Sequence, residues 1–170
     1  GFFKASLADI FNSFIGGIIA FTPKDTCGAI VSWNTITATD ECSVGLTLTS
    51  NYQPNTLFSE GSTTVIYTAT DAQGNTTTCS FVVAVIDNRP PVFTTDCPKD
   101  TIVKTDLGSC STAVSWVMPS AIDNCSGNDV TVKSDSINGQ KFGIGLHTVT
   151  ITARDTVSPN GNVVSCSINI

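Results

Sequence analysis

The chain has little of what most enzymes and metal proteins use. Its 170 residues contain one His and no Cys-x-x-Cys pair, which argues against a zinc site. Eight Lys and Arg stand against fourteen Asp and Glu, so no basic patch is available for nucleic acid or anionic lipid. No nucleophile elbow, phosphate loop or paired-carboxylate pattern occurs. The sequence therefore predicts a protein that is not an enzyme and has no nucleic-acid partner.

Cysteine, by contrast, is abundant. Seven Cys occur in the chain, and their positions repeat along it. Such use is typical of an oxidising compartment, where disulfides stabilise small domains. We therefore expect a secreted protein that is extracellular or lies at the cell surface.

One sequence pattern occurs twice. C-G-A-I-V-S-W, eight residues and Cys occupy 27–42, and C-S-T-A-V-S-W, eight residues and Cys occupy 110–125. Downstream, F-x-x-G-x-x-x-V-x-Y-x-A-x-D at 58–71 recurs at 142–155 with Ile in place of Tyr. The offsets are 83 and 84 residues. A repeat of this length indicates two copies of one small domain in tandem.

Within each copy, short segments of alternating apolar and polar residues are separated by turn residues. This period, with abundant Thr and Val, predicts an all-β fold of two tandem immunoglobulin-like β-sandwiches. Trp33 and Trp116 are the expected core anchors. The expected strands include 29–33, 46–49, 64–69 and 80–86 in the first copy, and 102–104, 113–117, 130–133 and 148–153 in the second.

The predicted domains are residues 17–86 and 94–170. Residues 87–93 form a linker, which two prolines stiffen. Residues 1–16 differ from both copies, because their apolar side chains recur at the spacing of an amphipathic helix. This segment is too short and too polar to span a membrane. It is either a lid on the first sandwich or a docking element for a neighbouring subunit, through Phe2, Phe3, Leu7, Ile10, Phe11 and Phe14.

Several motifs resemble the hyalin repeat. They are C-P-x-D at 97–100, G-x-C at 108–110, V-S-W-x-x-P-x-A-x-D-N-C at 114–125, and Y-T-A-T-D-A-Q-G-N-T-T-T-C-S-F at 67–81. The resemblance covers both copies and leaves out residues 1–16. It implies an immunoglobulin-like extracellular module of adhesive, matrix and bacterial surface proteins, and it brings no catalytic residues.

The family pattern has four Cys in each copy. It implies the disulfides Cys27–Cys42 and Cys110–Cys125, together with Cys97–Cys166 between the first and last strands. In the first copy, Phe14 stands where the second copy has Cys97. Cys79 is therefore left over, either as a buried free thiol or for a bond between chains.

Acidic turns offer candidate calcium ligands. The candidates are Asp40, Asp71, Asp123 and Asp155, whose oxygens suit a hard cation. The alternative is that these side chains hydrogen-bond their own turns, with Gly74 supplying a positive φ. Asn75 and Asn124 fit the N-glycosylation pattern, and Thr101, Ser136 and Thr156 lie in triplets suited to bacterial O-glycosylation.

The last strand of the second copy is shorter than its counterpart in the first. Either the chain is a fragment of a longer array, or the second sandwich has an open edge there, with Ile168 and Ile170 beside a slot that an added strand could fill. The segment at 1–16 of another molecule is the candidate, and such head-to-tail contacts build filaments. The predicted function is therefore a structural subunit of a fibre, filament or surface appendage that forms a homopolymer.

The alternative is an adhesin or stalk segment. It would bind glycans or a cell-surface protein through its loops, and it predicts an exposed aromatic cluster, for which Tyr52 and Phe58 are the candidates.

Overall fold

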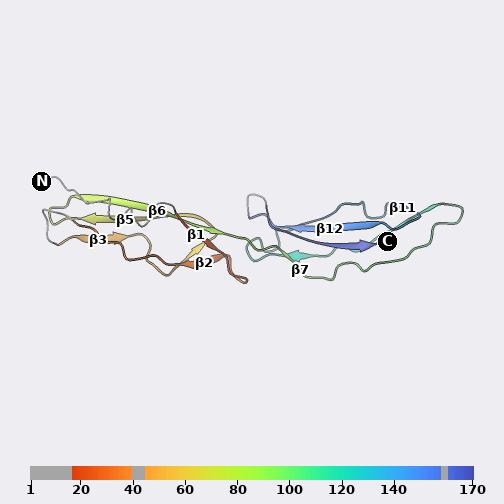
Figure 1. Cartoon of the computed structure of the whole chain (residues 1–170), viewed down its shortest axis with the longest axis horizontal. Helices are drawn as coiled ribbons and strands as arrows, with labels where there is room; N and C mark the ends of the chain where they lie inside the picture. Colours follow the sequence, from red (N-terminus) through yellow and green to blue (C-terminus); the bar gives the residue numbers. More distant parts are fainter. Residues whose placement is uncertain (1–16, 40–44, 158–160) are drawn as a thin grey trace. The chain divides into compact units, whose positions relative to one another are not determined.

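The computed structural model describes residues 17–39, 45–157 and 161–170. Their regular structure consists of β-strands, which confirms the all-β prediction (Figure 1). None of these residues belongs to a helix with the length and apolar character to cross a membrane. The helical pattern predicted for residues 1–16 lies outside the described residues.

The chain divides into two compact units, Gly1–Asp87 and Asn88–Ile170. The division falls inside the predicted linker. We refer to these as the first and second units.

The first unit is built from two sheets. Its four-stranded sheet has the order β1 (Ile18–Phe21), β6 (Thr76–Ile86), β5 (Gly61–Thr70) and β3 (Thr47–Ser50). The long strands β5 and β6 are antiparallel, whereas β1 runs parallel to β6, with Ile18 opposite Val83. The second sheet pairs β2 (Gly28–Val31) with β4 (Thr56–Ser59). Both sheets contribute to one core, as the predicted sandwich requires.

Trp33 anchors this first core. Its indole is buried and packs edge-on against Phe58 and Phe81, while its Nε1–H donates to the hydroxyl of Tyr67 at 2.8 Å. The alternation along β5 explains why the core forms here. Val65, Tyr67 and Ala69 are buried, and the residues between them are not. The prediction for Trp33 is confirmed.

The second unit has three small sheets. The first has the order β10 (Thr131–Ser134), β12 (Thr148–Arg154) and β13 (Val163–Asn169). The others pair β8 (Ser111–Ala113) with β11 (Lys141–Gly143), and β7 (Val92–Phe93) with β9 (Ala121–Ile122). Trp116 lies in the core with Phe142, Val149 and Ile151, as predicted.

The last strand is joined to the first part of the chain differently in the two units. The strand predicted at 102–104 is wrong, because residues 101–106 have no regular structure. One backbone bond, from Thr101 N–H to Asn169 O at 2.9 Å, ties this segment to β13. The carboxylate of Asp100 also accepts bonds from the backbone and side-chain N–H groups of Asn169. The side chain of Asp100 therefore accepts a backbone N–H of β13 that the carbonyl of a neighbouring strand would otherwise accept.

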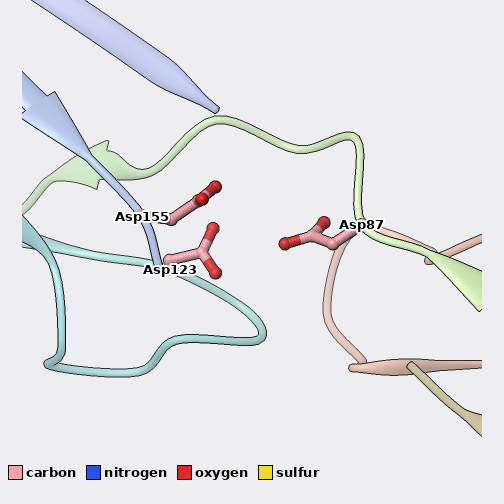
Figure 2. A group of neighbouring side chains, drawn as sticks. All are labelled: Asp87, Asp123 and Asp155. Atoms are coloured by element: carbon pink, nitrogen blue, oxygen red, sulfur yellow. The ribbon is translucent and has the colours of Figure 1, made fainter. Parts of the chain in front are cut away.

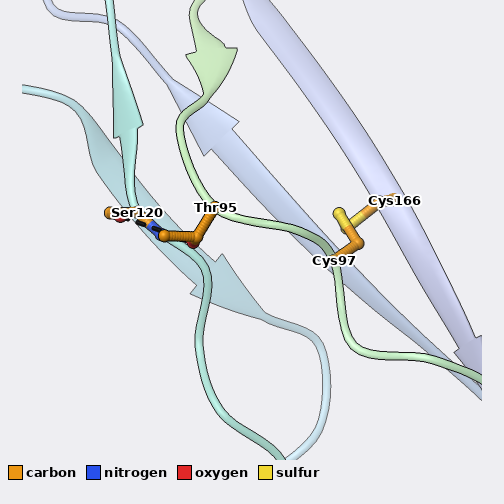
Figure 3. Close-up of a disulfide and its surroundings, with 4 residues drawn as sticks. All are labelled: Thr95, Cys97, Ser120 and Cys166. Carbon is orange, nitrogen blue, oxygen red and sulfur yellow. Dashed lines mark hydrogen bonds between the residues drawn. A yellow bond between two sulfur atoms is a disulfide. The ribbon is translucent and has the colours of Figure 1, made fainter.

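A disulfide joins Cys97 to Cys166 across 69 residues, as the family pattern implies (Figure 3). Nearby, the backbone N–H of Ser120 donates to the hydroxyl of Thr95, which holds the same segment to the chain before β9.

Of the other two predicted disulfides, one involves a residue that is not described and one is not formed. Cys27 is disulfide-bonded, and its expected partner Cys42 lies outside the described residues. Cys125 is also bonded, but Cys110 is free and exposed, so the structure does not contain the expected Cys110–Cys125 bond. The two cysteines flank different ladders. Cys110 precedes β8, which pairs with β11, whereas Cys125 follows β9, which pairs with β7.

Cys79 is a half-buried free thiol. It packs against the first core from β6, opposite Tyr67. Burial raises the pKa of this thiol, because the thiolate would lose its hydration. These features agree with the buried-thiol interpretation of the odd cysteine.

Candidate functional site

Two buried acidic side chains of the second unit, Asp123 and Asp155, lie close together. Asp123 directly follows β9 and Asp155 directly follows β12. Both side chains are buried, at 8% and 3% exposure. We call them the carboxylate pair.

A tight turn fixes Asp123. Its backbone N–H and O exchange bonds of 3.0 Å with Gly127, and its Oδ1 accepts the N–H groups of Cys125 and Ser126 at 2.8 Å. This Asx turn satisfies one carboxylate oxygen and sets the direction of the other.

A second loop fixes Asp155. Its Oδ1 accepts the N–H of Asn162 at 2.9 Å. The hydroxyl of Ser126 accepts the backbone N–H of Thr156 at 3.1 Å, so the turn that carries Asp123 is bonded directly to the loop that carries Asp155. The two acidic residues are thus held together by backbone geometry.

The carboxylate pair has two oxygens without partners. Carboxylate oxygens of Asp123 and Asp155 approach within 4.8 Å, and Figure 2 shows both groups directed into the same space. The Oδ2 atom of each is buried and accepts no hydrogen bond. Two buried anionic groups at this distance repel each other, and each unpaired oxygen has lost its hydration. The arrangement suits a positively charged ligand.

Asp71 behaves differently, although it matches Asp155 in the repeat. Its Oδ1 accepts the N–H groups of Gln73 and Asn75, and its Oδ2 accepts the side-chain amide of Asn75 at 2.7 Å. The amide bond from Asn75 is the main reason that the pKa of Asp71 lies below its usual value. Gly74 allows the turn with a φ of 87°. Asp71 therefore hydrogen-bonds its own turn and has no free oxygen to offer to a cation.

Two further acidic residues, Asp40 and Asp87, belong to the first unit. Asp40, the counterpart of Asp123, lies outside the described residues. Asp87 is buried at the end of β6 and accepts a 2.9 Å bond from the hydroxyl of Thr22 in its own unit.

An apolar groove occupies another part of the second unit. Its volume is about 600 Å³, and its exposed lining includes Ile102, Ile144 and Leu146, which are 99%, 79% and 79% exposed. Phe142 and His147 form part of the lining, and their rings lie 5.3 Å apart. This groove was not predicted from the sequence. The sequence does contain a signal, because F-G-I-G-L-H at 142–147 places Ile144 between two glycines and Leu146 directly after the second.

The predicted assembly residues separate into two groups. Ile168 is 2% exposed and belongs to the second core, so its side chain is not available to a partner. Ile170 is half-buried and lines the groove. The predicted strand addition at β13 meets an obstacle, because Asp100 and Thr101 bond the edge at Asn169. The predicted residues between Phe2 and Phe14 lie outside the described residues.

The aromatic cluster expected of an adhesin is absent at the predicted positions. Phe58 is 2% exposed, and Tyr52 is half-buried with its ring 5.0 Å from that of Phe58. The alternation in β4 directs Phe58 inward between two less buried neighbours, and Tyr52 packs against the same core.

The predicted glycosylation residues occupy varied positions. Asn75 is exposed, but its amide is bonded to Asp71. Asn124 is half-buried, with its amide 3.4 Å from the sulfur of Cys125. Thr101 and Thr156 are exposed and Ser136 is half-buried. Glycosylation of these residues stays a prediction.

Comparison with known proteins extends the resemblance. A hyalin of Lytechinus variegatus is 33% identical over 147 residues, which cover 85% of this chain and 27% of that protein. A hyalin of Strongylocentrotus purpuratus is 31% identical, over 97% of this chain and 14% of that protein. A mouse protein named for its sushi, von Willebrand factor type A, EGF and pentraxin domains is 33% identical over 90% of this chain and 4% of its own length. The chain thus spans about a quarter or less of each relative.

Solved structures to which this chain has some similarity include Drosophila N-cadherin EC1-4 and mouse cadherin-23 EC22-24. The first has 14% identity and a TM-score of 0.37, with 90% of this chain and 47% of the other covered. The second has 12% identity and a TM-score of 0.39, with 92% and 63% covered.

The family model described as the HYR domain matches residues 14–85 and again residues 86–170. Two adjacent matches account for both units, and hyalins lie among the relatives. The chain therefore belongs to the HYR-domain family and consists of two tandem extracellular modules of the adhesive or structural type.

Proposed function

We propose that this chain is a structural segment of an extracellular fibre, matrix or surface appendage, without enzymatic activity. The observation that carries the proposal is that one module occurs twice, each copy with its own core. Such repetition extends a protein in one dimension, whereas an active site is generally assembled from unlike parts. The described residues contain no arrangement of nucleophile, base and orienting group to suggest otherwise.

We further propose that the chain self-associates through the apolar groove. The groove exposes Ile102, Ile144 and Leu146, and water contact with these side chains is unfavourable. The proposed occupant is the apolar segment at residues 1–16 of a second copy, which offers Phe3, Leu7, Ile10 and Phe11 among others. A groove on one module and a segment on another make a head-to-tail contact, and repetition of that contact forms a filament.

The test is the assembly state of the full chain in its oxidised form. Sedimentation and electron microscopy should show assemblies that grow with concentration. Leu146→Asp should abolish them, because it places a charge in the apolar contact. Leu107→Asp is the matched control, since Leu107 is fully exposed in the same unit but does not line the groove.

A change in the donor segment completes the test. Phe3→Asp with Phe11→Asp should also abolish assembly. A chain that stays monomeric at high concentration would overturn self-association, and equal losses from Leu146→Asp and Leu107→Asp would remove the groove as its site. A monomer that binds glycans or a surface protein would favour the adhesin alternative.

A further inference from the structure

We propose that the carboxylate pair of the second unit binds a calcium ion. Asp123 and Asp155 each present one buried Oδ2 atom with no hydrogen bond, and carboxylate oxygens of the two side chains lie within 4.8 Å. The proposed site is separate from the apolar groove, and it does not depend on the proposed assembly.

The distance fits one shared cation. Ca²⁺ binds oxygens at about 2.3–2.6 Å, so two oxygens on one ion lie at most about 5.2 Å apart. Mg²⁺ binds at about 2.0–2.1 Å and requires near-octahedral geometry, so the corresponding limit is about 4.2 Å. The separation, which is at most 4.8 Å, therefore allows one Ca²⁺ to contact both carboxylates. The preference for calcium over magnesium is for the titration to test.

A shared proton is the main alternative to a cation. It would place one carboxyl group as a donor to the other, but no hydrogen bond joins Asp123 to Asp155 in the described residues. Among the described residues, neither Asp123 nor Asp155 forms an ion pair. A divalent cation would offset both negative charges together.

Preorganisation of the pair also favours binding. The Asx turn of Asp123 and the bond from Asn162 to Asp155 occupy the two Oδ1 atoms. The contact between Ser126 and Thr156 keeps the two loops in register. Both Oδ2 atoms are therefore positioned before any ion arrives, which reduces the entropy lost on binding. Gly127 and Thr156, which adjoin the two loops, are exposed, so these loops lie at the surface of the unit.

A comparison of Asp155 with Asp71, its counterpart in the first unit, shows that the repeated Asp alone is not sufficient for a calcium site. Asp71 uses both oxygens in its own turn, where Asn75 follows four residues later. In the second unit, the corresponding Asn162 follows Asp155 by seven residues and bonds Oδ1 alone of that carboxylate. The longer loop leaves Asp155 Oδ2 free for a ligand.

The experiment is a titration of the full oxidised chain, freed of metal by a chelator, followed by amide NMR. Calcium should shift the N–H signals of Cys125, Ser126 and Asn162 saturably, because these groups donate to the two carboxylates. Extracellular calcium modules bind with dissociation constants of about 0.1–1 mM, so saturation is expected by about 10 mM. At ten times the dissociation constant, calcium should raise the ratio of folded to unfolded second unit about tenfold.

Three variants test the assignment. Asp155→Asn should weaken calcium binding at least tenfold, because it removes one of the two anionic ligands. Asp129→Asn, a change at an exposed carboxylate of the same unit, and Asp71→Asn should bind like the unaltered chain. If Asp123→Asn fails to fold, Asp155→Asn and the titration of the unaltered chain still decide the question.

The results that would overturn the proposal are equally definite. They are the absence of saturable shifts by about 10 mM calcium, an equal response to magnesium, or the same loss from Asp129→Asn as from Asp155→Asn. None of these outcomes depends on whether the chain forms filaments.

Discussion

Tyr67 of the first unit and Ile151 of the second occupy the same place in the repeat, and this difference changes the hydrogen bonding of each core. The Tyr67 hydroxyl accepts the buried N–H of Trp33 at 2.8 Å. Ile151 offers no acceptor, and the buried Nε1–H of Trp116 has no partner among the described residues. The same Trp is therefore a satisfied donor in one copy and an unsatisfied donor in the other.

The acidic turns differ in the same direction. Asp71 is saturated by its own turn, whereas Asp155 keeps one oxygen without a partner. Polar groups that the first unit satisfies are thus left open in the second. A repeat shares the position of a residue, but the chemistry at that position depends on its neighbours.

The two units also join the last strand to the first part of the chain by different means. In the first unit, β1 forms a parallel ladder with β6 over four residues. In the second unit, the disulfide Cys97–Cys166 and the bonds of Asp100 and Thr101 to Asn169 replace that ladder. One unit uses backbone pairing where the other uses a covalent bond.

The largest expected effect follows from breaking that covalent bond. Replacing Cys97 and Cys166 by Ser should lower the free energy of unfolding of the second unit by about 4 kcal/mol, as the chain-entropy model gives for a loop of this length. Denaturant unfolding monitored by hydrogen exchange in each unit measures the change. Cys110→Ser is the control and should change stability by less than about 0.5 kcal/mol, because this thiol is free and exposed. Equal losses from the two changes would contradict the role of the disulfide.

The next effect concerns the cores. Tyr67→Phe should lower the free energy of unfolding of the first unit by about 1–3 kcal/mol, because it leaves the N–H of Trp33 buried without an acceptor. It would make the first core resemble the second in this respect. Tyr52→Phe is the matched control, with an expected change of less than about 0.5 kcal/mol because no partner of its hydroxyl is found in the described residues. If Tyr67→Phe changes the free energy of unfolding no more than Tyr52→Phe does, the Trp33–Tyr67 hydrogen bond does not contribute to the stability of the first core.

The smallest effect is the response to acid. The pKa of Asp71 is lowered mainly by the Asn75 side chain, and the pKa of Asp100 is lowered mainly by the backbone N–H of Asn169. Since the folded pKa lies below the unfolded value of about 3.9, each carboxylate stabilises its unit above that pH. The contribution is lost as the pH falls through the lower folded value.

Matched variants assign this acid response to each unit. Asp71→Asn should flatten the pH dependence of the first unit below about pH 4, and Asp100→Asn should do the same in the second. Urea unfolding at a series of pH values tests both. If the free energy of unfolding of either variant depends on pH as that of the unaltered chain does, that carboxylate does not cause the acid response.

Several features could be predicted because they depend on local pattern. The alternation in β5 identified a half-buried strand, and the residues around Trp33 and Trp116 identified two cores. The four-cysteine pattern of the family led to Cys97–Cys166. The prediction failed at 102–104, where apolar residues that read as a strand line an open groove instead. Alternation shows that a segment can pair, but not that a neighbour is present to pair with it.

By itself, the sequence determined the tandem repeat, the all-β class and the acidic, cysteine-rich character of an extracellular module. These properties follow from composition and from spacings along the chain. The tertiary structure alone decided that Asp123 and Asp155, 32 residues apart, share one space, and that Ile102 and Leu146 line one groove. It also decided that Asp71 and Trp33 are satisfied where Asp155 and Trp116 are not. The physical reason is that hydrogen bonding and apolar contact depend on distances between atoms, which the fold sets and the spacing of residues along the chain does not.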